Sequence, residues 1–439
     1  MDTATKVEPD AAGMREDRLD RITEHFGTHY VDTGKITGCQ ITVVRAGHVA
    51  YHRSLGLMDR ERAVPMADDA IFRIYSMTKP IASVALMQLY ERGMFQLVDP
   101  VHRYIPEWRT QQVGEVQADG SVTLVKPERP MNMRDVLMHT TGLPGSLFPD
   151  NPIDEALAQA RRALGREHTL ADVTALLAQH PLKFHPGTHW NYGLSTDIVG
   201  RLVEILSGLC FDEYLEREVY EPLGMTDTGF YVPEASLPRL AACYQYRPAN
   251  SPRLMEGEFA NRVTHPHPYL SGAGGLVSTT HDYIAFCQML ANGGQLDGRR
   301  VLGRKTIELM TANHLPGGAT LADLAMGGFG EAGFEGVGFG LGFAVGLGPA
   351  ATAMAGSAGE YYWGGAASTA FWVDPVEDLF VVFMTQLFPS IAYPLRAQLR
   401  AGGRRWRVRR SGGRRWRRPG RRGQRPRPSV VDGLVHEGP

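Results

Sequence analysis

Segments with the pattern of β-strands lie near both ends of this chain, and most segments between them have the pattern of helices. Residues 36–57 place apolar residues on both sides of a turn at Ala46-Gly47-His48, which predicts a hairpin of two antiparallel strands. Three later runs rich in Phe, Val and Trp also predict strands: Phe339–Val345, Ser368–Asp374 and Leu379–Thr385. Strands so far apart in the sequence predict one antiparallel sheet built from both ends of the chain, with a mainly helical region inserted between them.

The predicted helices follow from the spacing of apolar residues. Residues 14–30 place their apolar side chains on one helical face, and residues 76–92 contain no Gly and a single Pro in the first turn, where no N–H is needed. Further helices are predicted at Leu157–Leu164, Thr169–Gln179, Ser195–Leu206 and Asp282–Ala291. We therefore expect an α/β sandwich unit formed by residues 14–110 and 270–400, and a mainly helical unit formed by residues 111–269.

The charge of the chain is distributed unevenly. Residues 402–428 carry 13 Arg and no Asp or Glu, whereas residues 1–401 hold 33 basic and 45 acidic side chains, a net charge of −12. An acidic body repels phosphate backbones, so nucleic acid is not an expected partner of residues 1–401. No run reaches the length of a membrane span, and the N-terminus lacks the apolar core of a secretory signal. We expect a cytoplasmic protein with no membrane partner.

The Arg-rich tail, residues 402–439, is expected to be disordered because it has no apolar periodicity. All 13 basic residues of its first part are Arg, although the chain also contains 6 Lys. This bias suggests GC-rich coding DNA, and our hypothesis is that residues from Gly402 onward are read out of frame. Resequencing that restores an apolar C-terminal helix would confirm it, and the same frame in independent clones would refute it. The alternative is an arm that binds RNA or a membrane surface.

The first candidate for chemistry is Ser76-Met77-Thr78-Lys79, which begins a predicted helix. Lys79 stands about one turn after Ser76 on the same face, so its ammonium group can reach the hydroxyl. The helix N-terminus adds free N–H groups and a partial positive charge, which favour a developing oxyanion. The alternative is an N-cap Ser followed by a surface Lys. Against it, Lys79 lies within an apolar helix, where a lysine needs a buried partner.

Rival sites are not supported. No Ser stands in G-x-S-x-G, and the nearest sequence is Gly193-Leu194-Ser195-Thr196-Asp197, so a nucleophile elbow is not predicted. His265 and His267 have no third His or carboxylate nearby, which favours a loop over a metal site. The four Cys form no C-x-x-C pair, and we expect buried free thiols. No metal or organic cofactor is expected.

Five motifs follow one another along the chain: Ser76-Met77-Thr78-Lys79, His139-Thr140-Thr141-Gly142-Leu143-Pro144, Pro186-Gly187-Thr188-His189-Trp190-Asn191-Tyr192, Gly274-Gly275-Leu276-Val277-Ser278-Thr279 and Trp363-Gly364-Gly365-Ala366. With these motifs in this order, most of residues 15–400 resembles the serine β-lactamase-like hydrolases related to class C β-lactamases, and within them the family VIII carboxylesterases. The resemblance implies an α/β fold of the β-lactamase/penicillin-binding-protein kind, an antiparallel sheet flanked by helices. The site would lie in the cleft between the two units.

The resemblance also implies roles for individual residues. Ser76 would be the nucleophile, Lys79 its activating partner, and Tyr192 the residue that shares proton transfer with Lys79. The backbone N–H groups of Ser76 and Ala366 would form the oxyanion hole. Such chemistry is sensible because a Ser hydroxyl needs a neighbouring base. Tyr and Lys both start near a pKa of about 10, and which of them takes the proton stays open. For Tyr192 the alternative is a core aromatic beside Trp190.

Two departures from the β-lactamase pattern favour esters as substrates. Where lactamases carry Lys-Thr-Gly, this chain has Trp363-Gly364-Gly365, so the cation for a β-lactam carboxylate is missing. Where the family has Tyr-x-Asn, this chain has Tyr192-Gly193-Leu194, which removes an amide that would bind a substrate amide. Trp363 is expected either to line an apolar substrate pocket or to pack within the sheet. Gly364 and Gly365 allow close approach of the substrate or form a bulge, and His139 is expected to be scaffold.

The sequence therefore predicts a serine carboxylesterase that cleaves small-molecule esters, with short to medium acyl chains, through an acyl-enzyme on Ser76. A β-lactamase, a D-amino-acid peptidase or an acyltransferase could use the same residues, because the acceptor is set by loops. A catalytically silent binding protein is the alternative of another class. The natural substrate and the oligomeric state are left open.

Overall fold

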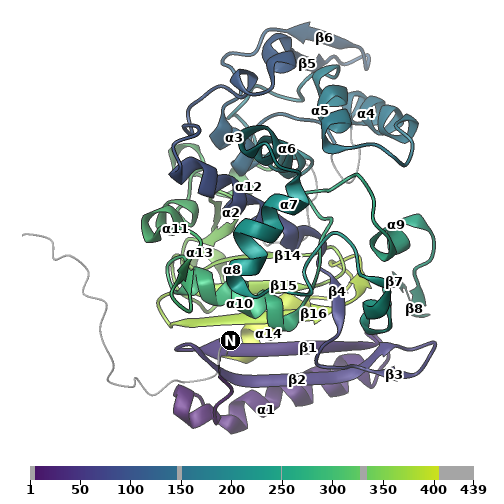
Figure 1. Cartoon of the computed structure of the whole chain (residues 1–439), viewed down its shortest axis with the longest axis vertical. Helices are drawn as coiled ribbons and strands as arrows, with labels where there is room; N and C mark the ends of the chain where they lie inside the picture. Colours follow the sequence, from purple (N-terminus) through teal and green to yellow (C-terminus); the bar gives the residue numbers. More distant parts are fainter. Residues whose placement is uncertain (1–4, 146–150, 249, 327–333, 405–439) are drawn as a thin grey trace, which may run out of the picture. The chain divides into compact units, whose positions relative to one another are not determined.

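A computed structural model describes residues 5–145, 151–248, 250–326 and 334–404. Its main feature is an antiparallel sheet with eight described strands (Figure 1). In spatial order they are β12 (Val337–Phe339), β13 (Ala344–Gly346), β14 (Tyr361–Gly364), β15 (Ala370–Asp374), β16 (Leu379–Thr385), β1 (Gly38–Arg45), β2 (His48–Asp59) and β3 (Val64–Pro65). β16 pairs antiparallel with β1, so segments from both ends of the chain lie side by side in one sheet. The predicted fold class is confirmed.

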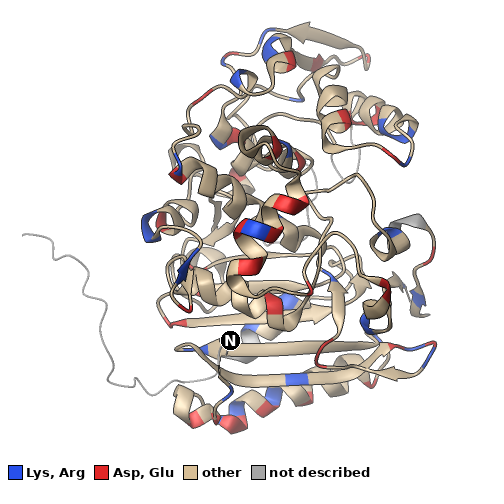
Figure 2. Cartoon of the chain, viewed as in Figure 1, with Lys and Arg blue, Asp and Glu red and all other residues tan. Residues whose placement is uncertain are grey.

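Helices cover both faces of this sheet, which explains why its central strands β15 and β16 are apolar and buried without alternation, whereas β2, nearer the edge, is partly exposed. On one face lie α1 (Glu16–Phe26) and α14 (Leu395–Arg404), with the ring of Phe26 5.4 Å from that of Phe383 in β16. On the other lies α10 (Thr280–Ala291), with the ring of Tyr283 5.2 Å from that of Phe371 in β15. In Figure 2 charged residues line the outer side of α1, whereas the strands are mostly uncharged.

The region between the two sets of strands is mainly helical, as predicted. After α2 (Thr78–Glu91), which belongs to the predicted sandwich unit, it contains α3 (Met133–Met138), α4 (Pro152–Ala163), α5 (Leu170–Ala178), α6 (Ser195–Ser207), α7 (Phe211–Leu215), α8 (Glu221–Leu223) and α9 (Glu258–Asn261). Side-chain caps fix the starts of several helices. For example, Thr169 accepts a hydrogen bond from the N–H of Asp172, whose carboxylate accepts one from the N–H of Thr169. Later short helices are α11 (Arg304–Met310), α12 (Leu321–Leu324) and α13 (Pro349–Thr352).

Small sheets connect these layers. β4 (Ile71–Arg73) pairs with β9 (Val277–Thr279), and this pair leads directly into the N-terminus of α2. The others are β5 (Val113–Val116) with β6 (Val122–Val125), β10 (Gln295–Leu296) with β11 (Arg299–Arg300), and β17 (Leu387–Phe388) with β7 (Tyr244–Arg247) and β8 (Asn250–Leu254). Within the described ranges, no helix combines the length and the apolar character that crossing a membrane requires.

Three expectations differ from the structure. The predicted single strand Phe339–Val345 is wrong, because it is split into β12 and β13 by a turn in which Gly342 has φ +96° and packs against Ser83 of α2. Cys210 is exposed, whereas the other three Cys are buried as expected. Residues 402–404 continue α14, and the rest of the predicted tail lies outside the described residues. The division into two units stays a prediction.

Candidate active site

Ser76 stands in a short 3-10 turn, η3 (Tyr75–Met77), between β4 and α2. Gln386 ties this turn to the main sheet, because its side-chain amide accepts a hydrogen bond from the N–H of Arg73 at 3.1 Å and donates one to the Arg73 carbonyl at 3.0 Å. Tyr75 has φ +43°, a conformation that costs a non-Gly residue roughly 1–3 kcal/mol. Such strain concentrates at functional sites, and here it directly precedes the predicted nucleophile.

Lys79 lies beside Ser76, as the spacing predicts. Its Nζ is 3.4 Å from Ser76 Oγ and donates to the carbonyl of Ala273 at 2.7 Å. Only 3% of Lys79 and 7% of Ser76 are exposed, so the alternative of a surface lysine is wrong. Ala273 lies shortly before β9, and the pairing of β9 with β4 brings its carbonyl to the start of α2.

Tyr192 comes from the inserted region and joins the same cluster. It lies just before α6, which packs against α2. Its ring centroid is 4.2 Å from Lys79 Nζ, and its hydroxyl oxygen accepts a hydrogen bond from Trp363 Nε1 at 3.3 Å. A cation over the ring face and a donor at the hydroxyl oxygen are both favourable contacts, and they hold Tyr192 beside Lys79. Tyr192 also stacks on Trp190 at 5.8 Å, so its role as a core aromatic and its place in the cluster coincide.

The predicted oxyanion donors lie on two segments that touch. An added Cβ on Gly365 would collide with the carbonyl of Ile74, which shows that the turn after β14 lies against the turn holding Ser76. Within the described residues, the backbone N–H groups of Ser76 and Ala366 donate no hydrogen bond to the protein. Two free N–H donors on adjoining turns are what an oxyanion hole requires.

His139 lies behind Tyr192 and is fully buried. It ends α3 with φ +61°, and its ring lies 5.2 Å from that of Tyr192 and 5.7 Å from that of Phe339. Burial, together with the positive charge of Lys79, lowers the pKa of His139 well below 6.5. The imidazole is therefore neutral at physiological pH, and the scaffold role of His139 stays a prediction.

Sequence reasoning missed the carboxylate of Asp197 on α6. It is almost completely buried and accepts hydrogen bonds from Tyr269 Oη at 2.7 Å, Ser271 Oγ at 2.7 Å and the N–H of Ala273 at 3.0 Å. It thereby fixes the residue whose carbonyl binds Lys79. A charged residue followed by Ile198 and Val199 on a helix was the available signal, whereas the carbonyl of Ala273 gives no signal in the sequence.

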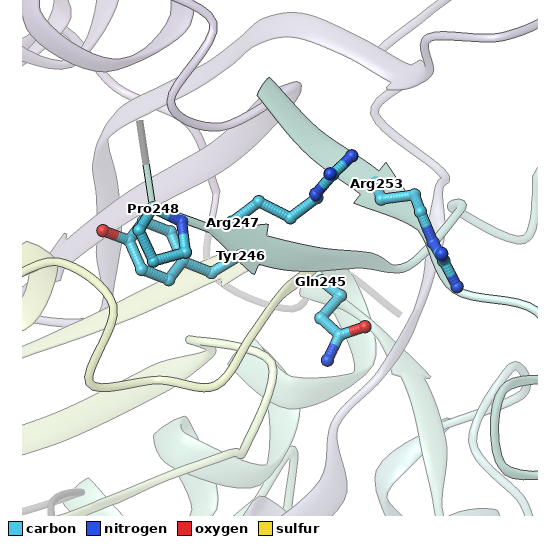
Figure 3. Close-up of a pocket in the computed structure, with 5 residues that line it drawn as sticks. All are labelled: Gln245, Tyr246, Arg247, Pro248 and Arg253. Carbon is cyan, nitrogen blue, oxygen red and sulfur yellow. The ribbon is translucent and has the colours of Figure 1, made fainter. Parts of the chain in front are cut away.

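One cavity of about 370 Å³ lies elsewhere, on the β7–β8 hairpin (Figure 3). It is lined by Gln245, Tyr246, Arg247, Pro248 and Arg253, none of which belongs to the Ser76 cluster. In the part of the chain that the structure describes, no group of three or more His, Cys, Asp or Glu is arranged to hold a metal ion.

An antiparallel sheet with helices on both faces, an inserted helical region and a buried Ser–Lys pair at the start of a helix together define the serine hydrolases of the β-lactamase and penicillin-binding-protein fold. The family model for beta-lactamase matches residues 19–402, and the chain belongs to this family. This confirms the resemblance to serine β-lactamase-like hydrolases that the five motifs indicate.

Individual proteins are similar over most of the chain. Protein Rv1367c from Mycobacterium tuberculosis is 32% identical over 365 residues, which cover 82% of this chain and 88% of that protein. Esterase EstB from Burkholderia gladioli is 30% identical over 431 residues, 91% of this chain and 98% of that protein. The structure of EstCE1, described as a hydrolase with promiscuous acyltransferase activity, matches with a TM-score of 0.73 and 27% identity, over 88% of this chain and 99% of EstCE1.

Proposed function

We propose that this protein is a carboxylesterase that hydrolyses small-molecule esters through an acyl-enzyme on Ser76. The observation that carries the proposal is the contact of Ser76 Oγ with the buried ammonium group of Lys79, at 3.4 Å. The similarity to Esterase EstB along almost the whole chain supports an ester as the substrate.

The proposed reaction has two steps. Ser76 Oγ forms a bond to the ester carbonyl carbon while its proton passes to the Lys79–Tyr192 pair, and the N–H groups of Ser76 and Ala366 bind the resulting oxyanion. The bond to the alcohol oxygen then breaks, and the pair returns the proton to the leaving alcohol. Water repeats the sequence and releases the acid. The proton acceptor is a property of the coupled pair rather than of one residue.

The surroundings of Ser76 favour a neutral, apolar acyl group of short to medium length. Trp363 occupies the strand position where lactamases have a lysine, and its indole N–H is directed to Tyr192. Leu194 occupies the place of the amide in Tyr-x-Asn and packs against Gly145. These features support the placement among family VIII carboxylesterases and weigh against a β-lactamase or a D-amino-acid peptidase.

The test is turnover of p-nitrophenyl acetate, butyrate and octanoate, with nitrocefin run beside them. We expect ester turnover that falls at least about 10³-fold in Ser76→Ala and about 10²–10⁴-fold in Tyr192→Phe. Nitrocefin as the preferred substrate would replace the esterase proposal with a β-lactamase. Full ester turnover by Ser76→Ala, or none by the wild type, would overturn the proposal, and the latter result would favour a silent binding protein.

Acyl transfer is the second candidate, because EstCE1 is described as having promiscuous acyltransferase activity. A second alcohol competes with water for the acyl-enzyme if it reaches the same carbonyl. Adding a primary alcohol to the p-nitrophenyl butyrate assay and measuring the new ester against butyric acid separates the two acceptors. A new ester as the main product favours a transferase.

A further inference from the structure

The turn after β14 is held from behind by the C-terminal helix. Arg396, in the first turn of α14, donates from its Nη2 to the carbonyls of Gly365 and Thr369, both at 2.8 Å. These two carbonyls stand at either end of the turn that joins β14 to β15. One nitrogen thus closes the turn with both of its N–H groups.

The contact requires the glycines of the Trp363-Gly364-Gly365 motif. An added Cβ on Gly364 would collide with the guanidinium group of Arg396, and one on Gly365 would collide with the Ile74 carbonyl and Thr369 Oγ1. Gly364 therefore makes room for a cation behind the strand. The Trp363-Gly364-Gly365 motif has no lysine of its own, but the guanidinium group of Arg396 lies beside it.

The carbonyl of Gly365 and the N–H of Ala366 belong to the same peptide unit. That carbonyl accepts hydrogen bonds from Arg396 and from the N–H of Ser368, the latter at 3.0 Å. A charged donor at the carbonyl oxygen polarises the peptide and strengthens its N–H as a donor, and two donors also fix the plane of the peptide. The other end of this unit is the free N–H assigned to the oxyanion hole.

We propose that Arg396 is a positioning residue for the oxyanion hole: it orients and polarises the Gly365–Ala366 peptide so that the Ala366 N–H binds the developing negative charge. The proposal rests on the proposed function. It assigns a role to α14 that the motifs around Ser76 do not contain. Oxyanion binding is stronger in the transition state than in the ground state, so losing Arg396 lowers kcat and leaves KM nearly unchanged.

The experiment compares Arg396→Met with Gln398→Met on the same helix. The side-chain oxygen of Gln398 is hydrogen-bonded to His25 of α1 and to Tyr30 just after it. Gln398→Met therefore weakens the packing of α14 against this segment without changing a contact to the turn after β14. We measure kcat and KM for p-nitrophenyl butyrate and the inhibition constant of butaneboronic acid, whose tetrahedral adduct on Ser76 places an oxygen in the hole. Removing an oxyanion donor outright costs about 10²–10³-fold in kcat, and here the donor stays but loses its support.

For Arg396→Met we expect a kcat about tenfold lower, KM within twofold of the wild type, and boronate binding weakened by the same factor as kcat. Arg396→Lys, which keeps a charged donor, should recover part of the loss. Gln398→Met should leave kcat and boronate binding within twofold even where its melting temperature falls. Identical kinetics for the two Met variants would overturn the proposal. A rise in KM confined to carboxylate-bearing esters would also overturn it, because Arg396 would then bind substrate.

Gly364→Ala approaches the same contact from the strand and serves where Arg396→Met does not fold. Gly364→Ala should lower kcat and boronate affinity together. The variant that combines Gly364→Ala with Arg396→Lys should have a kcat no lower than that of the less active single variant, because both substitutions disturb the same contact. Additive losses would contradict the shared contact.

Ser76→Ala in the same series distinguishes failure of the esterase mechanism from failure of the Arg396 proposal. Turnover that survives in Ser76→Ala refutes the esterase mechanism. Loss of turnover in Ser76→Ala, with wild-type kinetics in Arg396→Met, refutes only the role of Arg396.

Discussion

Lys79 is a cation buried in an apolar helix, and its position depends on a residue in another part of the chain. The ammonium group donates to the Ala273 carbonyl at 2.7 Å, and the N–H of Ala273 donates to Asp197 at 3.0 Å. A buried cation is stable only with such partners, and a buried carboxylate only with donors such as Tyr269 and Ser271. The placement of the amine beside Ser76 therefore extends back to α6.

Asp197 should affect activity through the segment that holds Lys79. In Asp197→Asn the side chain has one acceptor oxygen instead of two, so the segment around Ala273 loses a hydrogen bond and Lys79 is held less firmly. We expect kcat/KM for p-nitrophenyl butyrate to fall about tenfold, because displacing a catalytic group by about 1 Å can lower the rate by up to about 10²-fold. The matched control is Asp282→Asn, another buried carboxylate, which accepts from Asp227 and Thr228 and does not contact Lys79 or Ala273. Equal losses in both variants would mean that Asp197 acts only through stability.

His139 should make the stability of the fold depend on pH. Burial and the nearby Lys79 lower the pKa of His139 in the folded state well below 6.5, its ordinary value in the unfolded chain. At a pH between the folded and the unfolded pKa, the unfolded chain therefore binds more protons than the folded protein. The stability that His139 contributes is complete above pH 6.5 and is lost as pH falls, by at most about 1.4 kcal/mol per pH unit. We predict that His139→Asn, which tolerates the left-handed backbone, loses less stability than the wild type between pH 7.5 and pH 5.5 in urea unfolding. Parallel losses in both proteins would exclude His139 as the titrating group.

At the scale of elements, α4 is fixed to the loop before Tyr192 by a fully buried ion pair. Lys183 Nζ lies 2.6 Å from Asp154 of α4, and these side chains are 1% and 0% exposed. Lys183 also contacts Asn191, the residue before Tyr192, at 3.4 Å. The position of Tyr192 therefore depends on the docking of α4 as well as on α6.

We predict that Lys183→Met lowers the free energy of unfolding by about 3–5 kcal/mol, because it leaves the Asp154 charge buried without its cation. The variant that replaces both residues, Lys183→Met with Asp154→Leu, should recover more than half of that loss, since no lone charge remains. Urea unfolding of the three variants at pH 7.5 measures this. A double variant as unstable as Lys183→Met would show that the pair contributes by attraction rather than by avoiding an unpaired charge.

Elements with a clear apolar pattern are the ones that the sequence predicts well. Apolar spacing identifies α1 and α6, because each buries the face that the helical period selects, and unbroken apolar runs identify β15 and β16, which are buried on both faces. Residues 339–345 mislead, since their length and composition suit a strand while Gly342 allows a turn there. Motifs identify Ser76, Lys79 and Tyr192 by side-chain type. The Ala273 carbonyl and Arg396 reach the site only through chain packing, which no local pattern encodes.

For the whole molecule, the two ends of the chain depend on each other. β1 pairs with β16, and α14 packs beside α1 over the same face of the sheet. Leu395 and Leu399 of α14 are 1% exposed, and Arg400 forms a buried pair with Glu360 just before β14. These contacts are complete by Arg404, the last described residue of α14.

We predict that a chain ending at Arg404 keeps the melting temperature and kcat/KM of the full chain. A chain ending at Tyr393 should not fold stably, because burial of two Leu side chains contributes about 3–6 kcal/mol and leaving Glu360 unpaired costs about 3–5 kcal/mol, against a typical stability of about 5–15 kcal/mol. Thermal unfolding and ester turnover of the two truncated chains provide the comparison. Loss of stability in the chain ending at Arg404 would show that residues 405–439 take part in the fold.

If Ser76 carries the covalent intermediate, an alkyl fluorophosphonate should react with its hydroxyl. This reagent leaves a stable tetrahedral adduct on an activated serine. Intact mass followed by peptide mapping should find one adduct per chain, located on Ser76, with no labelling of Ser76→Ala and labelling slowed in Tyr192→Phe. An adduct on another residue, or equal labelling of Ser76→Ala, would contradict it.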